Sequence, residues 1–453
     1  MSHPSLPTPR SAAELLPHFH RCGAVSTDTR SLPPGTMFVA LKGPRFDGNQ
    51  YAAQALRAGA ACVVVDDPAV VPPGDDRYLL VDNSLRALQQ LATLRRREFA
   101  IPVFGLTGSN GKTTTKELIH AVLATEKQVH ATRGNLNNHI GVPLTLLAMP
   151  TDTEIAVVEM GANHPGDIQE LAEIAEPTHG LITNVGYAHI ENLGSLDGVQ
   201  RTKGALFDFV RTHAGQLFVN AADHRVVAAA KDATQQLTYG TPEADFWLEM
   251  AQNRLDGMRL LVHSRHWAQP LTVETSLSGP HNAHNILAAI VAGYAFGIDP
   301  THIQQGIAGY RSANNRSQLL RRGNLTIWLD AYNANPSSMR ATVEHVFSVD
   351  SGRVALILGD MYEVGDNSPT IHADLGRLIA QHQPSLTIGV GPQMRHLVQA
   401  ISGPTQWYPD AAASQADLPA LLQGIDTLVI KGSRAMALEQ VLDYLPADSP
   451  SSR

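Results

Sequence analysis

A glycine-rich turn between a strand-like run and a helix-like run constrains the fold of this chain more than any other stretch. Residues 101–125 read IPVFGLTGSNGKTTTKELIHAVLAT; the apolar residues before the turn predict a buried strand, and those after it recur at helical spacing. The turn therefore lies at a helix N-terminus, where backbone N–H groups can bind phosphate oxygens. Lys112 offers a cation for the terminal phosphates, and the Thr113 hydroxyl can bind magnesium. The predicted ATP-binding loop consists of Thr107, Gly108, Ser109, Asn110, Gly111, Lys112, Thr113 and Thr114.

This turn departs from the general phosphate-loop pattern at one position. The general pattern has glycine where this chain has Leu106, so only the shorter TGxxGKT core is present. This departure narrows the range of phosphate-loop proteins that the chain can resemble. The alternative interpretation is a tight strand-to-helix turn that happens to contain Lys-Thr. The strand and the helix predicted on either side favour the phosphate loop.

The length and the pattern of the chain predict three α/β domains. At 453 residues the chain is too long for one ordinary core. Residues 1–100 predict a small α/β unit, and residues 101–312 alternate strands and helices as in a parallel sheet, with an antiparallel flap over 235–277. Residues 313–453 alternate again. We expect a central P-loop parallel-sheet ATPase domain flanked by a small N-terminal α/β domain and a C-terminal Rossmann-like α/β domain.

Composition excludes several functional classes. The net charge of −8, without a long basic run, argues against a nucleic-acid surface. The two cysteines, Cys22 and Cys62, are too few for a disulfide framework and fit a reducing cytoplasm. The chain shows no signal-peptide pattern and no run of the roughly 18 apolar residues that a membrane helix needs. We expect a cytoplasmic monomer without a membrane span.

Candidate magnesium ligands follow the strands. Glu159 ends the apolar strand EIAVVE, so its carboxylate should emerge at the same sheet edge as Thr113; the alternative is an acid that caps the next helix. His189 follows a strand, and Lys203 lies just inside a predicted helix. Because an ammonium cannot bind a cation, they suggest a second magnesium site only if Lys203 is deprotonated and modified, for instance as a carbamate. Taken singly, they read as an ordinary histidine and a solvated lysine.

Other polar residues suit a nucleotide. Asn282 and Asn285 stand one turn apart at the start of a predicted helix that begins at Asn282, and an amide can pair with an adenine edge. Arg316 suits a phosphate, and Asp330 suits ribose hydroxyls. A helix cap or a surface ion pair is the alternative for each of them. A polar stretch over residues 26–47 could bind a sugar nucleotide or form a solvated loop.

Together these features resemble the Mur ligase family across essentially the whole chain. The resemblance rests on TGSNGKTTT, the strand-final Glu159, His189 with Lys203, the HNxxN of residues 281–285 and the strand end at Asp330. Within the family, five segments are similar to the members that add a dipeptide. These segments are GNLNNHIGVPLTLL, EMGANHPGDI, DAYNANPSSM, GDMYEVG and VIKGSRAMALE.

The resemblance implies an ATP-dependent amide ligase of peptidoglycan synthesis. In such an enzyme ATP phosphorylates the terminal carboxylate of UDP-N-acetylmuramoyl-tripeptide, and the amine of D-alanyl-D-alanine attacks the acyl phosphate. Two magnesium ions neutralise the crowded charges, and Lys112 steadies the transferred group. The resemblance implies that Thr113 and Glu159 hold one ion, and that His189 and a carbamylated Lys203 hold the other.

The resemblance also implies individual substrate contacts. Asn282 would face adenine, Asp330 the ribose and Arg316 the γ-phosphate. The domain over residues 1–100 would bind the UDP sugar, and the domain over residues 313–453 the incoming dipeptide. The implied substrate residues are Ser26, Thr27, Asp28, Thr29 and Arg30 for the uridine diphosphate, Asn135, Asn137 and Asn138 for the muramoyl side, and Asn333, Asn335 and Lys431 for the dipeptide.

The chain also departs from the family pattern near the expected ribose and dipeptide sites, at His139, Asn314, Asn315, Leu329 and Ala331. Three rival functions are open. The ligase that adds the third amino acid carries DNPR in its diaminopimelate-adding forms, and this chain has none. A folylpolyglutamate synthase has no use for a GNLNN segment. An ATP-switched binding module would release phosphate without the dipeptide and would leave Lys203 unmodified.

Overall fold

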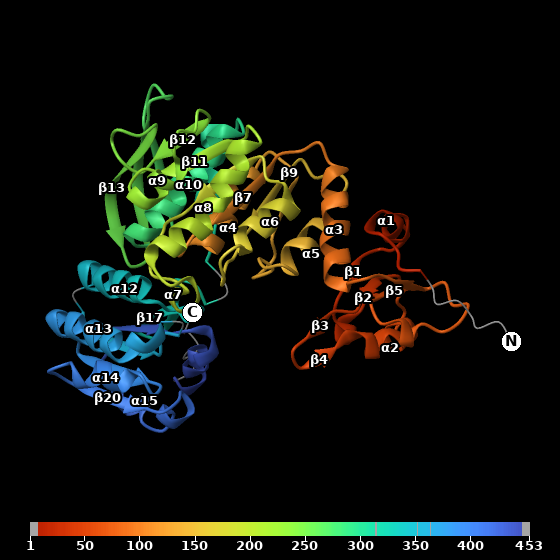
Figure 1. Cartoon of the computed structure of the whole chain (residues 1–453). Helices are drawn as coiled ribbons and strands as arrows, with labels where there is room; N and C mark the ends of the chain where they lie inside the picture. The colour runs from red at the N-terminus through yellow and green to blue at the C-terminus, as the bar shows by residue number, and fades with distance from the viewer. Residues whose placement is uncertain (1–7, 313–314, 351, 363, 446–453) are drawn as a thin grey trace, which may run out of the picture.

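Three main sheets organise the chain, and the computed structural model describes residues 8–312, 315–350, 352–362 and 364–445 (Figure 1). Figure 1 shows the N-terminal and C-terminal sheets attached to different ends of the central domain. Residues 1–7, at the N-terminus where a signal peptide would lie, and residues 313–314, at the predicted second domain boundary, lie outside the described residues. Among the described helices, none is long and apolar enough to cross a membrane.

The N-terminal domain is built on a four-stranded sheet. Its strand order is β1-β2-β5-β6, and all three pairings are parallel. The first helix begins with a capping box, in which the Ser11 hydroxyl accepts from the Glu14 N–H and the Glu14 carboxylate accepts from the Ser11 N–H. The elements are α1 (Ala12–Arg21), β1 (Val25–Ser26), η1 (Thr29–Ser31), β2 (Met37–Val39), the hairpin β3 (Lys42–Gly43) and β4 (Phe46–Asp47), η2 (Gly48–Tyr51), α2 (Ala52–Arg57), β5 (Cys62–Val65), η3 (Pro68–Val70), β6 (Tyr78–Leu80) and α3 (Ser84–Arg97).

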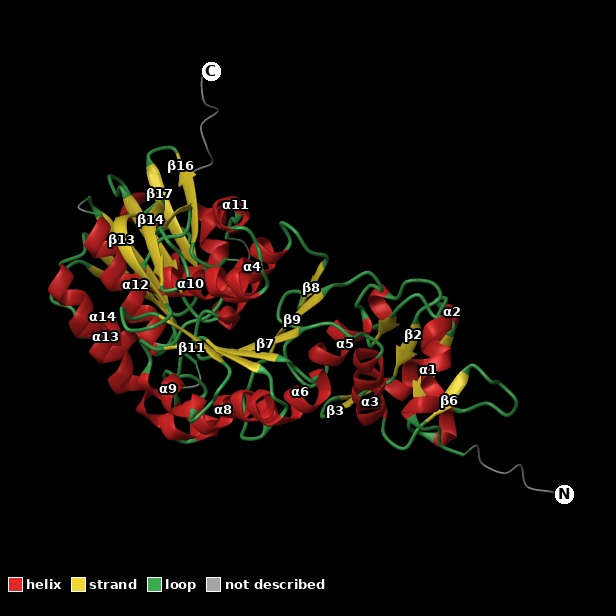
Figure 2. Ribbon diagram, turned by 90° about the horizontal axis from the view of Figure 1, so that it is seen from above, coloured by secondary structure: helices red, strands yellow, loops and turns green. Residues whose placement is uncertain are grey.

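The central domain contains a nine-stranded sheet in the order β15-β14-β13-β12-β11-β10-β7-β9-β8. Figure 2 shows its strands β7, β9 and β8 extending toward the N-terminal domain. The elements are β7 (Val103–Thr107), α4 (Lys112–Leu123), β8 (Val129–Ala131), α5 (Gly141–Leu147), β9 (Ile155–Glu159), α6 (Asp167–Ala175), β10 (His179–Ile182), α7 (Ile190–Leu193), α8 (Leu196–Thr212), β11 (Gln216–Asn220), α9 (His224–Ala230), β12 (Gln236–Tyr239), β13 (Phe246–Arg254), β14 (Gly257–Ser264), β15 (Leu271–Thr275), α10 (Pro280–Ala295) and α11 (Pro300–Gly309).

The expected antiparallel flap over residues 235–277 is only partly correct. β13, β14 and β15 pair antiparallel, but they continue the main sheet. β12, the first strand of that segment, pairs in parallel with β11. The helix α9 connects β11 to β12, and a strand that returns through such a crossover lies parallel to the strand before it.

Side chains of β7 alternate between the two faces of the central sheet. Val103 packs into a cluster with residues of α6 and α8, whereas Phe104 and Leu106 pack with residues of α4 and α10. All three side chains are fully buried. The strand that leads into the glycine turn is therefore held on both faces, so the position of the turn is set by the core of the domain.

The C-terminal domain has a six-stranded sheet in the order β16-β17-β21-β18-β19-β20. Only β16 runs antiparallel within this described sheet. The elements are β16 (Gln318–Arg322), β17 (Leu325–Asp330), α12 (Pro336–Val349), β18 (Val354–Gly359), η4 (Gly365–Asn367), α13 (Ser368–His382), β19 (Leu386–Val390), α14 (Met394–Gln399), β20 (Thr405–Tyr408), η5 (Ala412–Ser414), α15 (Leu418–Leu421), β21 (Thr427–Lys431), η6 (Arg434–Met436) and η7 (Leu438–Tyr444). The predicted α/β class is confirmed in all three domains.

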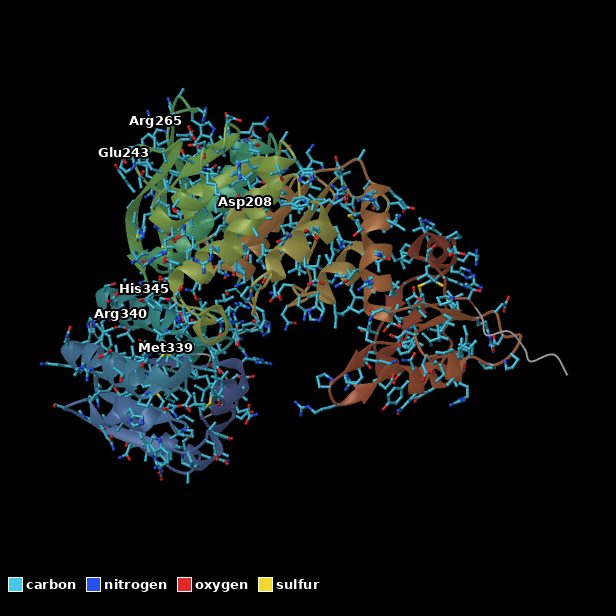
Figure 3. All side chains as sticks on the ribbon, in the orientation of Figure 1. Asp208, Glu243, Arg265, Met339, Arg340 and His345 are labelled. Carbon is cyan, nitrogen blue, oxygen red and sulfur yellow. The ribbon has the colours of Figure 1, made fainter. Side chains whose placement is uncertain are left out.

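A buried histidine joins the C-terminal domain to the central domain. His345 of α12 places its Nε2 atom 2.6 Å from the Ser278 hydroxyl, just before α10 (Figure 3). Burial, with His281 adding to it, lowers the pKa of His345 to about 4. The imidazole is therefore neutral at pH 7 and can pack inside this joint without an uncompensated charge.

A buried arginine joins the N-terminal domain to the central domain. Arg96, near the end of α3, donates to the carbonyls of Ala175 and Phe99 at 3.2 and 2.8 Å. It also reaches the carbonyls of Ile101 and Glu176 at 3.4 and 3.3 Å. One guanidinium therefore satisfies four carbonyls around the segment that leads into β7.

We expect Arg96→Met to destabilise the protein by about 2–3 kcal/mol, because these buried carbonyls lose a charged donor. The measurement is the denaturant midpoint of unfolding, followed by a probe in the N-terminal domain. The matched control is Arg97→Met, since Arg97 is exposed and pairs with the Glu176 carboxylate, at 2.6 Å. Equal midpoints for the two variants would contradict this role of Arg96.

Candidate active site

Two glycines shape the turn between β7 and α4. Gly108 has φ +154°, and a Cβ atom there would lie 1.8 Å from the Thr183 hydroxyl oxygen. Gly111 caps α4 with φ +79°, and a Cβ atom there would lie 2.5 Å from the Asn285 amide oxygen. Both positions therefore require glycine, for conformation and for space. The turn presents the N-terminus of the twelve-residue helix α4, which is a favourable place for phosphate.

The two residues that follow β10 hold this turn by hydrogen bonds. Asn184 accepts from the N–H of Ser109 through its carbonyl and from the N–H of Asn110 through its side chain, each at 3.0 Å. The Thr183 hydroxyl donates to the carbonyl of Asn110 at 2.6 Å. Sequence reasoning missed this support. The one feature of the sequence that could have indicated this support is the pair Thr183-Asn184, directly after a strand that neighbours the phosphate-loop strand.

Glu159 lies beside the first turn of α4, as its strand-end position predicted. The Thr113 hydroxyl and the Asn137 amide donate to its Oε1 atom at 3.2 and 2.8 Å. The side chain is 1% exposed, and Oε2 has no hydrogen-bond partner among the described residues. Oxygens that share an octahedral magnesium ion lie about 3 Å apart, so Thr113 and Glu159 fit one ion. A buried carboxylate with an unsatisfied oxygen also favours a bound cation.

A buried lysine that sequence reasoning missed stands behind Glu159. Lys116, on α4, is fully buried and donates to the Thr132 carbonyl at 2.6 Å. The Thr132 hydroxyl accepts from the Glu159 N–H at 3.0 Å. Lys116 thus ties the phosphate-loop helix to the strand end that carries the carboxylate. The feature of the sequence that could have indicated this role is a lysine three residues after Thr113, in a helix whose neighbouring residues are buried.

The structure corrects the expected position of Lys203. Helix α8 begins at Leu196, with Ser195 as its cap, so Lys203 lies well inside the helix and not just within its start. Its side chain is buried, and burial together with the charge of Lys112 lowers the pKa of Lys203 far below its ordinary range. Burial therefore favours the neutral amine and excludes the interpretation as a solvated lysine. His189 caps α7 with φ +54° and lines the same cavity as Glu159.

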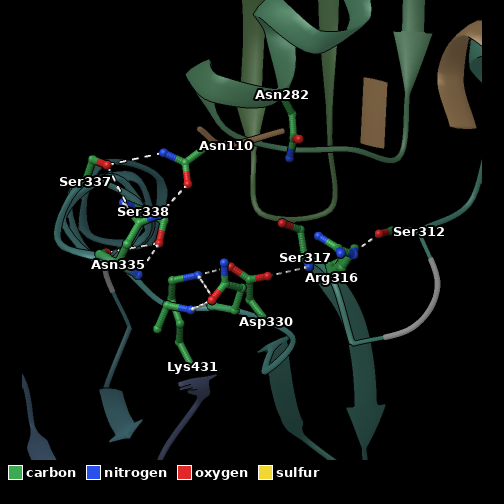
Figure 4. A network of polar contacts seen from close by, with 12 residues as sticks. Asn110, Asn282, Ser312, Arg316, Ser317, Asp330, Asn335, Ser337, Ser338 and Lys431 are labelled. Atoms are coloured by element: carbon green, nitrogen blue, oxygen red, sulfur yellow. Dashed lines mark hydrogen bonds and ion pairs between the residues drawn. The ribbon is translucent and has the colours of Figure 1, made fainter. Parts of the chain in front are cut away.

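The C-terminal domain contributes an ion pair to the site. Lys431, at the end of β21, donates to the Asp330 carboxylate and, at 3.2 Å, to the Asn333 carbonyl (Figure 4). Burial acts to raise the pKa of Asp330, but the charge and the hydrogen bond of Lys431 outweigh it, and the pKa lies below the ordinary value. The Arg316 guanidinium stacks on the Tyr332 ring at 3.5 Å. Neither Asp330 nor Arg316 is an isolated surface charge.

Hydrogen bonds across the cavity join the phosphate loop to the C-terminal domain. The Asn335 amide donates to the Asn110 side chain at 2.7 Å, and the Asn110 amide donates to the Ser337 hydroxyl at 3.2 Å (Figure 4). Asn335 also caps α12 by accepting from the Ser338 N–H at 2.9 Å. Asn335, which was expected near the dipeptide, thus caps α12 and contacts the phosphate loop, two residues from Asn333 on the cavity lining.

The start of α10 forms the wall opposite β17. The helix begins at Pro280, two residues before the predicted start at Asn282. The Asn282 amide donates to the Ser278 carbonyl at 2.8 Å, and the Asn285 amide donates to Asn282 at 3.2 Å. Both are buried. Asn285 lines a smaller cavity of about 220 Å³ under the phosphate loop, between α10 and the ends of β10, β11 and β12.

One cavity of about 840 Å³ collects most of the predicted residues. Its lining includes Ser109, Asn110, Gly111, Lys112, Thr113, Thr114, Asn135, Asn137, Asn138, Glu159, His189, Asn282, Arg316, Asp330, Asn333 and Lys431. The lining does not include Thr107, Gly108, Lys203 or Asn335, nor Ser26, Thr27, Asp28, Thr29 and Arg30 of the N-terminal domain. The cavity therefore lies between the central and C-terminal domains, and the asparagine-rich loop after β8 borders it.

No group of three or more His, Cys, Asp or Glu side chains that could hold a metal lies within the described ranges. The proposed ligand sets do not take that form, because one uses a threonine hydroxyl and the other a modified lysine.

Comparisons with known proteins cover almost the entire chain. Three family models match: "Mur ligase family, catalytic domain" over residues 22–96, "Mur ligase middle domain" over 106–293 and "Mur ligase, glutamate ligase domain" over 315–434. The UDP-N-acetylmuramoyl-tripeptide–D-alanyl-D-alanine ligase of Bacillus subtilis is 37% identical and aligns over 94% of both chains. The Escherichia coli ligase of the same name is 33% identical over 93% of both.

Solved structures show the same architecture. A crystal structure of MurF from Acinetobacter baumannii superposes with a TM-score of 0.86, at 29% identity, over 96% of this chain and 98% of that one. The MurF ligase of Thermotoga maritima in complex with ADP superposes with a TM-score of 0.83, at 26% identity, over 94% and 97%.

We expect Lys116→Met to raise the Mg²⁺ concentration needed for half-maximal ATP turnover by about tenfold or more, because Thr132, which holds the backbone of Glu159, loses its hydrogen bond to α4. The measurement is a Mg²⁺ titration at saturating ATP, with a denaturation midpoint recorded in parallel. Lys127→Met, beyond the end of α4, is the matched control. A variant that loses stability but keeps the wild-type Mg²⁺ dependence would show that Lys116 serves packing alone.

Proposed function

The chain belongs to the Mur ligase family, and from this premise we propose that it joins D-alanyl-D-alanine to UDP-N-acetylmuramoyl-tripeptide, with ATP converted to ADP and phosphate. Two relatives named for this reaction, the ligases of Bacillus subtilis and Escherichia coli, support the proposal. They are 37% and 33% identical to this chain over nearly its full length. This activity makes the chain an ATP-dependent amide ligase of peptidoglycan synthesis.

The observation that carries the proposal is the shared cavity. It is bordered by the phosphate loop, Glu159 and the asparagine-rich loop of one domain and by Asp330, Asn333 and Lys431 of another. A ligase must bring a nucleotide, a carboxylate and an amine to one place, and phosphoryl transfer depends mostly on positioning. A cavity built from two domains provides walls for different substrates on opposite sides.

Residues at the phosphate loop would prepare the carboxylate for attack. The N–H groups at the start of α4 and the Lys112 ammonium would bind the phosphates and stabilise the charge that develops on the transferred group. The γ-phosphoryl group passes to the tripeptide carboxylate, which turns a poor electrophile into an acyl phosphate. The dipeptide amine then attacks the carbonyl carbon of the acyl phosphate, and phosphate leaves.

Magnesium fits the residues present. We propose that Thr113 and Glu159 hold one ion, supported by their oxygen separation of 3.2 Å and by the buried, unsatisfied Oε2 atom. Bound magnesium supplies charge neutralisation where phosphate and carboxylate oxygens crowd together. The hydrogen bonds from Thr113 and Asn137 keep the Glu159 carboxylate directed at the loop.

Lys203 suits the second ion only as a carbamate. We propose that its neutral amine attacks carbon dioxide, forming an N–C bond and releasing one proton, so that the amine becomes a carboxylate-like group that can bind a cation. A neutral amine is the reactive form, and burial beside Lys112 favours neutrality at this position. His189, on the lining of the same cavity, would be the other protein ligand.

Substrate contacts outside the phosphate loop are also proposals. Asn282, Asp330 and Arg316 would contact adenine, ribose and the γ-phosphate, with all three on the cavity lining. Residues 1–100 would bind the uridine diphosphate through Ser26–Arg30, and residues 313–453 would bind the dipeptide through Asn333, Asn335 and Lys431. Asn135, Asn137 and Asn138 would meet the muramoyl side. We further propose a monomer that acts in the cytoplasm, where ATP and nucleotide precursors are available.

We expect phosphate release from ATP to require Mg²⁺, UDP-N-acetylmuramoyl-tripeptide and D-alanyl-D-alanine together, because the acyl phosphate needs its carboxylate and the turnover needs its amine. The measurement is phosphate release with each component omitted in turn, and with magnesium removed by a chelator. Release that continues unchanged without the dipeptide would support the ATP-switched binding module. Activity only with the UDP-linked dipeptide and a single amino acid would indicate the preceding ligase.

We expect Lys203→Ala to lower the coupled rate by about 100-fold, because one metal ligand is lost. Short carboxylic acids added to this variant should restore part of the rate by occupying the place of the carbamate. The exposed Lys231→Ala is the control and should keep the wild-type rate. Full activity of Lys203→Ala without any added acid would rule out the carbamate.

A further inference from the structure

The only two cysteines of the chain lie together in the N-terminal domain, away from the cavity described above. Cys22 follows α1 as its C-cap, and Cys62 opens β5. Their Sγ atoms are 3.7 Å apart, although 39 residues separate them in sequence. Nothing in the proposed ligase reaction uses either thiol.

We propose that Cys22 and Cys62 form a dithiol modification site, which a hydroperoxide oxidises reversibly to an intramolecular disulfide. The proposal rests on the pairing of the two sulfur atoms, their different exposure and the charges around Cys22. It is independent of the ligase activity.

Exposure assigns different parts to the two thiols. Cys62 is 5% exposed and packs in the domain core, whereas Cys22 is partly exposed at the edge of the same cluster. A small oxidant in solvent therefore reaches Cys22 first. Cys62 stands directly behind it, in the place of a thiol that resolves the first oxidation product.

The surroundings favour a reactive Cys22. The hydrogen bond from Cys62 lowers the pKa of Cys22 to about 7, burial opposes this change, and the charge of Arg21 adds to it. The same pairing, with burial, raises the pKa of Cys62. The C-terminal end of α1 disfavours a thiolate, whereas the positive charge of Arg21, the neighbour of Cys22 in the sequence, favours it.

The chemistry balances with one hydroperoxide. The Cys22 thiolate attacks the peroxide oxygen, the O–O bond breaks, and an alcohol or water leaves with the proton, so Cys22 becomes a sulfenic acid. The Cys62 sulfur then attacks the Cys22 sulfur, the S–O bond breaks, and water leaves. Two thiols lose two electrons and two protons in total, and a reducing thiol reverses the change.

The geometry needs only a small adjustment. A disulfide requires an S–S distance of about 2 Å, against the present contact of 3.7 Å. Cys22 is the C-cap of α1 and belongs to no helix or strand itself, while β5 holds Cys62 in register with Met37 of β2. The new bond would close a loop that contains β1, β2 and the segment 26–30.

The test uses the intact mass of the wild-type protein after treatment with hydrogen peroxide, followed by alkylation of the remaining thiols. We expect the loss of two hydrogen atoms, no alkylation and full reversal by dithiothreitol. A peptide map without reductant should join the peptide of Cys22 to that of Cys62 within one chain. Two alkylated thiols, oxygen added without loss of hydrogen, or a disulfide between two chains would overturn the proposal.

Single variants assign the order of events. In Cys62→Ser, a trap for sulfenic acids should label Cys22, because no thiol remains to resolve it; in Cys22→Ser, labelling of Cys62 should be much slower. Equal labelling in both variants would contradict the assigned roles. The oxidised wild-type protein should also unfold at a higher temperature than the reduced protein, since the bond restricts the unfolded chain, and Cys22→Ser should show no such shift.

An effect on ligation is a separate readout that rests on the proposed function. Because the closed loop contains the segment 26–30, we expect oxidation to change the KM for the UDP-linked substrate more than the KM for ATP. The mass and peptide data keep their meaning even if no ligase activity is found.

Discussion

The carboxylate of Glu159 is the feature around which the rest of the site is arranged. A charge buried at the end of a parallel strand is unfavourable unless hydrogen bonds and a cation compensate it. Thr113 and Asn137 donate to one oxygen, and the backbone N–H of Glu159 is fixed by Thr132. These contacts connect β9, the first turn of α4 and the loop after β8. The second oxygen, Oε2, has no hydrogen-bond partner among the described residues, which supports the proposal that it binds a magnesium ion.

The same arrangement explains how a fixed phosphate loop can serve a cavity shared by two domains. Asn184 accepts a hydrogen bond from the backbone of Asn110 in this loop, and the Asn110 side chain contacts Asn335 at the start of α12. His345, further along α12, contacts Ser278 beside α10. Two polar contacts on one helix therefore orient the C-terminal domain against the nucleotide side. This placement brings Asp330 and Lys431 to the cavity lining, opposite the phosphate loop.

The predictions from the sequence agreed best with the structure where the conformation of a residue is set by its neighbours along the chain. The unusual Leu106 has a simple explanation, because β7 continues through it to Thr107 and the turn begins only at Gly108. The proximity of Thr113 and Glu159 followed from the rule that parallel strands end at one edge. The pairing of β12 did not follow, since it depends on which strand packs beside it. The start of α8 and the Asn335 cap are local, set by the hydrogen bonds of Ser195 with Gly198 and of Asn335 with Ser338, and sequence reasoning missed them. The roles of the substrate residues stay predictions.

Local sequence was sufficient for the glycine turn, the α/β class of the three domains and the helix N-terminus that follows the turn, because dihedral preference and hydrophobic period act over a few residues. Family resemblance, carried by whole motifs, pointed to the reaction. Tertiary structure alone decided the contacts of Lys116 with Thr132, Asn110 with Asn335 and Cys22 with Cys62. Those pairs are distant in sequence, and only the packing of complete sheets and helices determines which distant side chains come within bonding distance.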